Sequence, residues 1–232
     1  MRTTVVCTLL ACIFSVSNSS TLLAAPIVTV PAGLQPGDQY RLVFLAIGDS
    51  VATSSDIAQY NTIVTLSANV NPALKALGTT FSVIGSTATV DARDNTGTNP
   101  TLGVGVPIYR LDGLRVADNN ADLWDGSIAN PILYQANGVA RPVEVWTGSG
   151  VDGRRDPWDG GSSFGTTHPT FGFANMAGSG WVYAGSQYDG FGRSYTYYGM
   201  SGVLTVVPEP SSIVLAAFAG IGLLCACRRR RD

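Results

Sequence analysis

The strand-like run 44–47 is followed by Gly48-Asp49-Ser50, a place where a serine could act as a nucleophile. A serine nucleophile needs a histidine base within hydrogen-bond reach, and the base needs a carboxylate that orients it. The chain has one histidine, His168. Serine-based hydrolysis would therefore depend on Ser50 and His168.

This block resembles the strand and Gly-Asp-Ser turn of SGNH esterases. That family supplies its base and carboxylate as Asp-x-x-His, whereas here Gly165 stands three residues before His168. Ser50 is therefore interpreted as a turn residue. A secreted hydrolase remains a second alternative.

Paired carboxylates could perform acid–base chemistry. Two groups of aspartates lie close together in the sequence: Asp118, Asp122 and Asp125, and Asp152, Asp156 and Asp159. Short aspartates among glycine and asparagine mostly shape turns. We therefore expect a protein that is not an enzyme.

Calcium binding is a weaker candidate, based on Asp118, Asn120 and Asp122. Their alternation reproduces the oxygen ligands that open an EF-hand loop. Leu123 stands where that loop needs glycine, and Ala129 stands where it needs glutamate. Turn formation is the favoured interpretation, and no cofactor is expected.

An aromatic residue precedes Asp-Gly at 124–126, 158–160 and 188–190. Exposed aromatic rings beside carboxylates suit the faces and hydroxyls of sugars. The glycine-rich loop makes Trp158 and Asp159 candidate ligand-binding residues, together with Arg154 and Arg155. Trp124 and Trp146 are predicted to lie in the core. Five tyrosines could extend the sugar-binding surface, although alternating tyrosines are equally typical of a strand: Tyr183, Tyr188, Tyr195, Tyr197 and Tyr198.

These side chains must be positioned by short strands and helices. Strands are predicted at 40–47, 80–84, 106–111, 143–146, 181–184 and 195–206, helices at 57–64 and from Asn71-Pro72 to Gly78, and one helical turn at 117–126. The first helix is predicted from its start at 53–56, which ends at Asp56, and from Ile57, Tyr60 and Val64 at spacings of three and four. Between them lie two long glycine-rich loops, 85–105 and 148–170. The pattern predicts an α+β fold.

Composition favours one globular domain. The 232 residues are 45% hydrophobic and 13% charged, which suffices for one core. All four cysteines lie in the two apolar ends, so the domain between them has no disulfide or thiolate site. Residues 26–207 hold fourteen acidic and nine basic side chains, which disfavours nucleic acid as a partner.

The N-terminal residues 1–25 fit a secretory signal peptide. Arg2 precedes an apolar stretch from Val5 to Val16, and small residues end at Ala24-Ala25. We expect signal peptidase to release a domain that spans 26–207. Lipidation at Cys12 is the alternative.

The C-terminal residues 208–232 hold Pro208-Glu209-Pro210, an apolar run 213–227 and Arg228-Arg229-Arg230-Arg231. They resemble the PEP-CTERM sorting tail of Gram-negative bacteria. The resemblance implies a transmembrane helix in an inner-membrane precursor, processing by an exosortase-type enzyme, and delivery to the cell surface or extracellular polysaccharide. The arginines would remain cytoplasmic. A permanent tail anchor is the alternative.

Several stretches of the middle domain resemble endostatin, a C-type lectin-like domain. They are Arg41-Leu42-Val43, Val106-Pro107-Ile108, 123–127, Val145-Trp146-Thr147-Gly148-Ser149 and Asp152-Gly153-Arg154-Arg155. The resemblance implies a single C-type lectin-like domain with long loops. The family's disulfide cysteines and the histidines of its zinc site are missing, so zinc is not carried over. The expected function is structural or adhesive, and a glycan- or calcium-dependent binding module is the first alternative.

Overall fold

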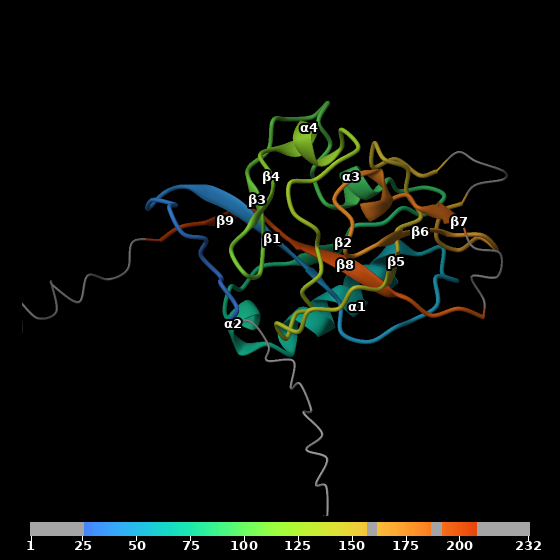
Figure 1. Cartoon of the computed structure of the whole chain (residues 1–232), viewed down its shortest axis with the longest axis horizontal. Helices are drawn as coiled ribbons and strands as arrows, with labels where there is room; N and C mark the ends of the chain where they lie inside the picture. The colour runs from blue at the N-terminus through green and yellow to red at the C-terminus, as the bar shows by residue number, and fades with distance from the viewer. Residues whose placement is uncertain (1–25, 157–161, 187–191, 208–232) are drawn as a thin grey trace, which may run out of the picture.

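The computed structural model describes residues 26–156, 162–186 and 192–207 (Figure 1). The predicted signal peptide and the tail from Pro208 lie outside these residues. In chain order the elements are β1 (Gln39–Leu45), α1 (Ile57–Asn69), α2 (Pro72–Lys75), β2 (Phe81–Val83), α3 (Ala92–Asn95), β3 (Ile108–Arg110), β4 (Arg115–Ala117), α4 (Asn120–Leu123), β5 (Glu144–Trp146), β6 (Thr170–Phe173), the 3-10 turn η1 (Ser179–Trp181), β7 (Gly185–Ser186), β8 (Thr196–Ser201) and β9 (Leu204–Thr205). The expected α+β class is confirmed.

One mixed sheet organises the domain. Its strand order is β4-β3-β1-β8-β5-β6-β7, with β2 also paired to β8 and β9 paired to β1. The first strand runs parallel to β3 and antiparallel to β8. Tyr40 of β1 pairs with Leu204 of β9. The first and the last strand of the described chain are therefore neighbours in the sheet.

Both faces of β1 are buried. Leu42 and Phe44 belong to the core under α1, whereas Val43 and Leu45 belong to a second core on the opposite face. A strand covered on both sides needs apolar residues at successive positions. This burial explains the continuous apolar run that predicted the strand.

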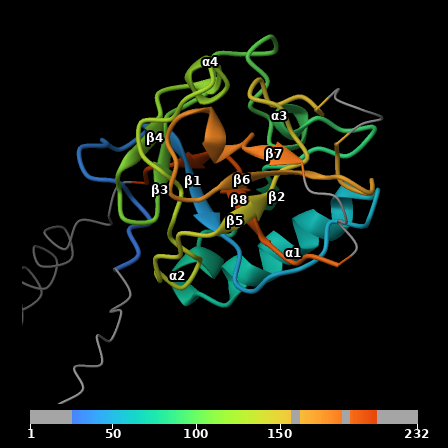
Figure 2. The ribbon, with the colours of Figure 1, turned by 45° about the vertical axis from the view of Figure 1, so that its right-hand side comes forward.

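Helices α1 and α2 cover one face of the sheet, and α3 and α4 lie on the other (Figure 2). Asp56 caps α1 by accepting a 3.0 Å hydrogen bond from the amide of Ala58. Tyr60 and Val64, the predicted apolar positions, are buried. Asn71 likewise caps α2, so both predicted helices are confirmed.

Much of the two glycine-rich segments predicted as long loops covers the other face, while Phe164 of the second segment packs against Tyr60 of α1. The first contains the short helix α3. The hydroxyls of Ser86 and Ser149 lie 2.8 Å apart and join the two segments, and Ser86 also accepts from the amide of Ala92 at 2.8 Å. Thr87 forms a β-bridge with Phe164. Parts of both loops are therefore buried in the core.

The predicted strand at 181–184 is wrong, because η1 and a turn occupy this place. The sheet instead uses β6, which begins at the last residue of the predicted loop 148–170 and continues through residues for which no element was predicted. A side chain at Gly172 would come within 2.1 Å of the Trp181 carbonyl oxygen, so glycine lets η1 press against β6. The strand predicted at 195–206 divides into β8 and β9 at Gly202, and β4 was not predicted.

Candidate functional site

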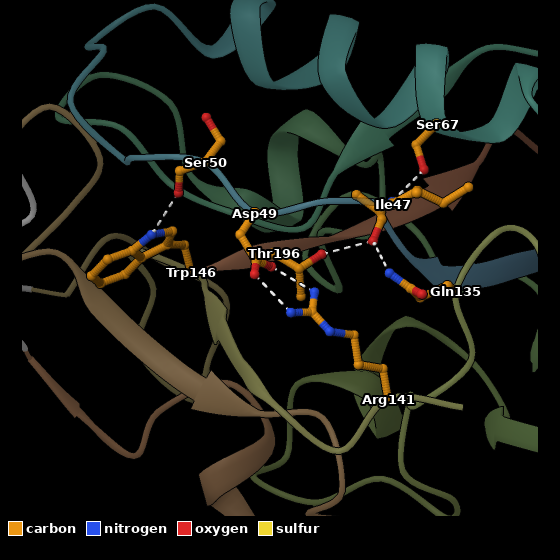
Figure 3. Close-up of polar contacts among 9 residues, drawn as sticks. Ile47, Asp49, Ser50, Ser67, Gln135, Arg141, Trp146 and Thr196 are labelled. Atoms are coloured by element: carbon orange, nitrogen blue, oxygen red, sulfur yellow. Dashed lines mark hydrogen bonds and ion pairs between the residues drawn. The ribbon is translucent and has the colours of Figure 1, made fainter. Parts of the chain in front are cut away.

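The Gly48-Asp49-Ser50 turn follows β1 and is held by distant parts of the chain (Figure 3). Both terminal nitrogens of Arg141 donate to the Asp49 carboxylate, at 2.6 and 2.7 Å. Ser50 pairs through its backbone with Tyr195. Its carbonyl accepts a 3.1 Å hydrogen bond from the indole of Trp146. The turn is thus anchored from two sides.

The end of β1 is fastened in a similar way. The carbonyl of Ala46 accepts from Gln135 at 3.1 Å and from Thr196 at 2.9 Å. The amide of Ile47 donates to the hydroxyl of Ser67 on α1 at 2.7 Å (Figure 3). Side chains from three separate segments therefore satisfy the backbone where the strand ends.

Hydrogen bonds among the described residues do not assemble the triad of a serine hydrolase in this region. In Figure 3 the hydroxyl of Ser50 points away from Trp146 and from the Asp49–Arg141 ion pair. Among the described residues no hydrogen bond joins Ser50 to His168, whose Nδ1 lies 2.8 Å from the hydroxyl of Thr167. Asp49 binds Arg141. The aspartate and the histidine thus have other partners.

The three candidate calcium ligands are engaged in separate contacts. Asp118 accepts a 2.6 Å hydrogen bond from Arg115, and its amide donates to Asp122 at 2.7 Å. Asn120 is buried and donates to the carbonyl of Gly103 at 2.9 Å. Within the described ranges, no three His, Cys, Asp or Glu side chains are grouped to hold a metal ion. All three residues take part in local hydrogen bonding around α4.

Arg154 and Arg155 line a surface cavity of about 430 Å³ together with Asp91 and Asp152. The Nε of Arg154 lies 3.6 Å from the carboxylate of Asp152, and both side chains are half exposed. The amide of Arg155 donates to Asp91 at 2.9 Å, and its guanidinium donates to the carbonyl of Ala88. The cavity therefore presents charges of both signs, supplied by segments about sixty residues apart.

The other half of this candidate site, Trp158 and Asp159, lies outside the described residues. Asp156, which precedes them, is buried and accepts a 2.9 Å hydrogen bond from Thr170 at the start of β6. The end of the segment that carries Arg154 is thereby fixed to the sheet.

The placement of the aromatic residues was partly predicted. Trp124 and Trp146 are in the core, as expected, and the indole of Trp124 donates to Thr98 at 2.9 Å. Tyr197 and Tyr198, which were candidates for an extended sugar-binding surface, are fully buried in β8. Burial raises the pKa of both hydroxyls far above the ordinary tyrosine value. These two tyrosines are packing residues of a strand, which was the alternative left open by the sequence, and they do not extend the candidate surface.

Arg41 was not singled out from the sequence. Its Nη1 donates to the carbonyls of Thr96 and Ser201, at 2.8 and 2.9 Å, and burial lowers its pKa. It lines a second cavity, of about 340 Å³, with Leu102 and Val203 among its neighbours. An arginine within an apolar strand was the signal that could have identified it.

The folded domain ends immediately before the sorting tail. The amide of Val206 donates to Asp38 at 2.9 Å, and its carbonyl accepts from Gly37 at 2.8 Å. In residues 26–156, 162–186 and 192–207, no helix combines the length and hydropathy needed to cross a membrane. The sorting residues Pro208, Glu209, Pro210 and 228–231, and the apolar run between them, lie outside the described residues.

Comparison with known families identifies this tail. A model described as the PEP-CTERM protein-sorting motif matches residues 206–231. No curated protein matches the chain. The match begins at Val206, the last residue that the sheet edge holds by backbone hydrogen bonds. The chain is therefore an exported, cell-surface-directed protein that carries an exosortase-targeting signal.

Proposed function

We propose that this protein is a non-catalytic structural or adhesive component of the cell surface or extracellular matrix, released from an inner-membrane precursor by an exosortase-type enzyme. The observation that carries the proposal is the position of the matched motif, which starts where β9 ends. Processing near Pro208-Glu209-Pro210 leaves the whole sheet intact. The product is the complete domain without its membrane segment.

The construction of the domain suits such a role. Its covering loops are fixed by buried hydrogen bonds, such as Ser86 with Ser149 and Thr147 with the Val182 carbonyl at 2.6 Å. A domain without cysteines keeps this shape in any redox environment outside the cell. A rigid, redox-independent domain is suited to a matrix or adhesive protein.

We further propose that the domain has a C-type lectin-like, endostatin-like arrangement. The similar stretches lie on β1, at the start of β3 and on β5. A long helix follows the first strand, and the first strand pairs with the two last ones, β8 and β9. These features support the assignment. An experimental structure in which β9 pairs elsewhere would remove it.

The test of processing is intact mass and cell fractionation in an exosortase-bearing host. In the variant, Pro208-Glu209-Pro210 is replaced by three alanines; the matched control replaces Ser211 and Ser212 instead. We expect the native and control chains to lose both ends and leave the membrane, and the variant to stay in it uncleaved. If all three keep the arginine tail, the protein is a permanently anchored ectodomain.

Glycan binding is the second candidate function. The cavity between Arg154, Arg155, Asp91 and Asp152 favours it, because both donors and acceptors of hydrogen bonds line one opening. Trp158 follows Arg155 by three residues in the sequence. We expect Trp158→Ala to abolish retention on the polysaccharide of the producing cell. Met176→Ala, at a half-exposed position on another loop, should retain binding.

Calcium dependence is tested in the same assay. If chelation leaves retention unchanged, the calcium-dependent form of this function is removed. If Trp158→Ala and the control bind equally, the proposal that Trp158 binds glycan is contradicted as well.

A further inference from the structure

A surface cavity of about 340 Å³ lies where several distant segments of the chain meet. Four elements or turns each contribute one residue to its lining: Arg41 of β1, Asp94 of α3, Asn120 of α4, and Val203 between β8 and β9. The other lining residues belong to the loop that joins α3 to β3: Gly97, Asn99, Leu102, Gly103 and Gly105. We call this the Arg41 cavity. Its volume is within the range of pockets that hold small ligands.

The guanidinium of Arg41 is fixed at this cavity without a carboxylate partner. Its Nη1 donates to the carbonyls of Thr96 and Ser201, and its Nη2 donates to the carbonyl of Gly97 at 3.4 Å. A guanidinium has more N–H groups than these three bonds occupy. In the described part of the chain, the ion pairs involve other arginines. The positive charge is therefore held in place and remains available to an anion.

Asn120 supplies an acceptor that has no donor. Its side chain is 4% exposed, and its Nδ2 donates to the carbonyl of Gly103 at 2.9 Å. Its Oδ1 has no hydrogen-bond partner among the described residues. Gly103 and Gly105 flank this amide, and neither carries a side chain that would cover it; a Cβ at Gly105 would come within 2.0 Å of Oδ1. Buried polar atoms are nearly always hydrogen-bonded, so an unpaired oxygen at a cavity indicates a ligand that donates to it.

The rest of the lining combines a second acceptor with apolar side chains. Asp94 is exposed, and its Oδ1 accepts a 2.6 Å hydrogen bond from Asn99, so its Oδ2 can accept from a ligand. Leu102 and Val203 are 82% and 45% exposed, and they offer contacts to the carbon atoms of a ligand. The cavity thus presents one cation, two acceptors and a small apolar surface.

We infer that the Arg41 cavity binds an acidic sugar, an inference that deepens the adhesive role and rests on the proposed function. The carboxylate of the sugar pairs with Arg41, because a guanidinium matches the planar geometry of that group. Hydroxyls of the sugar donate to Oδ1 of Asn120 and to Asp94, and its ring carbons contact Leu102. The Arg41 cavity shares no lining residue with the cavity at Arg154, so the two are separate places on the domain.

Other small ligands satisfy fewer of these groups. A neutral sugar leaves the charge of Arg41 unpaired. Inorganic sulfate pairs with Arg41 but has no hydrogen to donate to Asn120, and the carboxylate of Asp94 repels its second negative charge. A uronic acid carries both the carboxylate and the hydroxyls, and is therefore the class of sugar that fits the lining.

The test measures binding of a short fluorescein-labelled oligogalacturonate by fluorescence anisotropy. The probe is added to the full chain in non-ionic detergent and to the processed product. The matched probe is the same oligosaccharide with its carboxyl groups reduced to alcohols. We expect the wild type to bind the acidic probe and not the reduced one. Unlabelled galacturonate should displace the probe, and inorganic sulfate at the same ionic strength should not.

Two charge variants assign the binding to the cavity. Leu102→Glu places a carboxylate in the lining, and the control Leu66→Glu adds the same charge at a 63% exposed position of α1. Both positions are exposed, so both variants should fold. We expect Leu102→Glu to weaken binding of the acidic probe about tenfold, because the new carboxylate repels that of the sugar and pairs with Arg41. Leu66→Glu should bind as the wild type does.

The outcomes separate this inference from the function on which it rests. If the acidic probe does not bind, or if both variants bind as the wild type does, the cavity is not an acidic-sugar site, and retention of the processed protein on polysaccharide still supports the adhesive role. If sulfate or free alanine displaces the probe better than galacturonate, the cavity takes another class of ligand and the inference is overturned. Failure of processing affects the proposed function alone, since binding is measured on cut and uncut chains.

Discussion

The two faces of the sheet are covered by different means. On one face, α1 buries Tyr60 and Val64 in the same core as Phe44, and its own backbone groups are satisfied within the helix. On the other face, Val43 and Leu45 are covered mainly by irregular segments. Irregular backbone must find its hydrogen bonds elsewhere when it is buried. The comparison shows that a loop-covered face needs polar side chains inside it.

Those side chains are present on the loop-covered face. Ser86, Thr147 and Ser149 are fully buried, and each makes hydrogen bonds to backbone groups or to another of the three. In a domain without cysteines, such bonds hold the covering segments where an exported protein often uses disulfides. The helix-covered face depends more on the packing of apolar side chains.

Truncating a large aromatic residue on either face should have the largest effect. Phe44, which packs edge-on against Phe81 at 5.5 Å, and Trp181 are both fully buried, on opposite faces. We expect Phe44→Ala and Trp181→Ala each to lower the free energy of unfolding by about 3–5 kcal/mol. Urea unfolding of the processed protein measures both. A loss below about 1 kcal/mol for Trp181→Ala would show that the loop-covered face is loosely packed.

The helix-covered face could be predicted from the sequence and the loop-covered face largely could not. The spacing of Ile57, Tyr60 and Val64 and the cap at Asp56 are local signals, and they gave α1 correctly. By contrast, Ser86 meets Ser149 across 63 residues, and no local period encodes such a pair. Strand β6 was missed for a similar reason. A glycine at position 172 indicates a loop when only the local sequence is considered, and its role in letting η1 pack closely against the strand depends on a tertiary contact.

The candidate sites differed in the same way: sites formed by contiguous residues could be predicted, and sites formed by distant segments could not. The sorting tail could be identified because its motif, apolar run and arginines are contiguous, and a family match supports it. Arg154 and Arg155 were singled out, but Asp91, which lines the same cavity, comes from a segment about sixty residues earlier. Tertiary contacts that join distant segments decided each of these positions.

Breaking a charge pair on the loop-covered face should have the next largest effect. Arg110 donates to Asp112 through Nε at 2.9 Å and through a second nitrogen, and also to the carbonyl of Pro131 at 2.8 Å. The two side chains are 8% and 18% exposed. We expect Asp112→Asn to cost about 3 kcal/mol, because it leaves a mostly buried guanidinium without its carboxylate. The measurement is again urea unfolding.

The same pair predicts a pH dependence. Burial raises the pKa of Asp112, but hydrogen bonds from Arg110 and from the amide of Leu114 outweigh it and leave the pKa below the ordinary 3.8. Because the folded pKa is the lower one, this stabilisation is complete above about pH 4 and is lost as the pH falls below it. The difference in unfolding free energy between wild type and Asp112→Asn should therefore shrink in acid. A constant difference across this range would contradict the assignment.

Removing one buried hydroxyl should have a smaller effect, confined to the loop-covered face. Ser86→Ala leaves the buried amide of Ala92 without its 2.8 Å acceptor and removes the contact with Ser149. We expect a loss of about 1–3 kcal/mol. The control is Thr62→Ala on α1, whose exposed hydroxyl donates to the Ala58 carbonyl at 2.8 Å; it should change stability by less than about 0.5 kcal/mol. Equal effects would mean that buried hydroxyls do not hold the loops.

Removing the cap of α1 should have the smallest effect. Asp56→Ala takes away the side chain that accepts from the amide of Ala58, at a cost of about 1 kcal/mol. Because the hydrogen-bond partners described for Asp56 and Ser86 are different and the two residues act on opposite faces, the double variant should lose the sum of the two effects within about 0.5 kcal/mol. The double-mutant cycle is measured by urea unfolding. A coupling energy well above this value would show that the two faces respond as one network, and that the helix helps to position the loops.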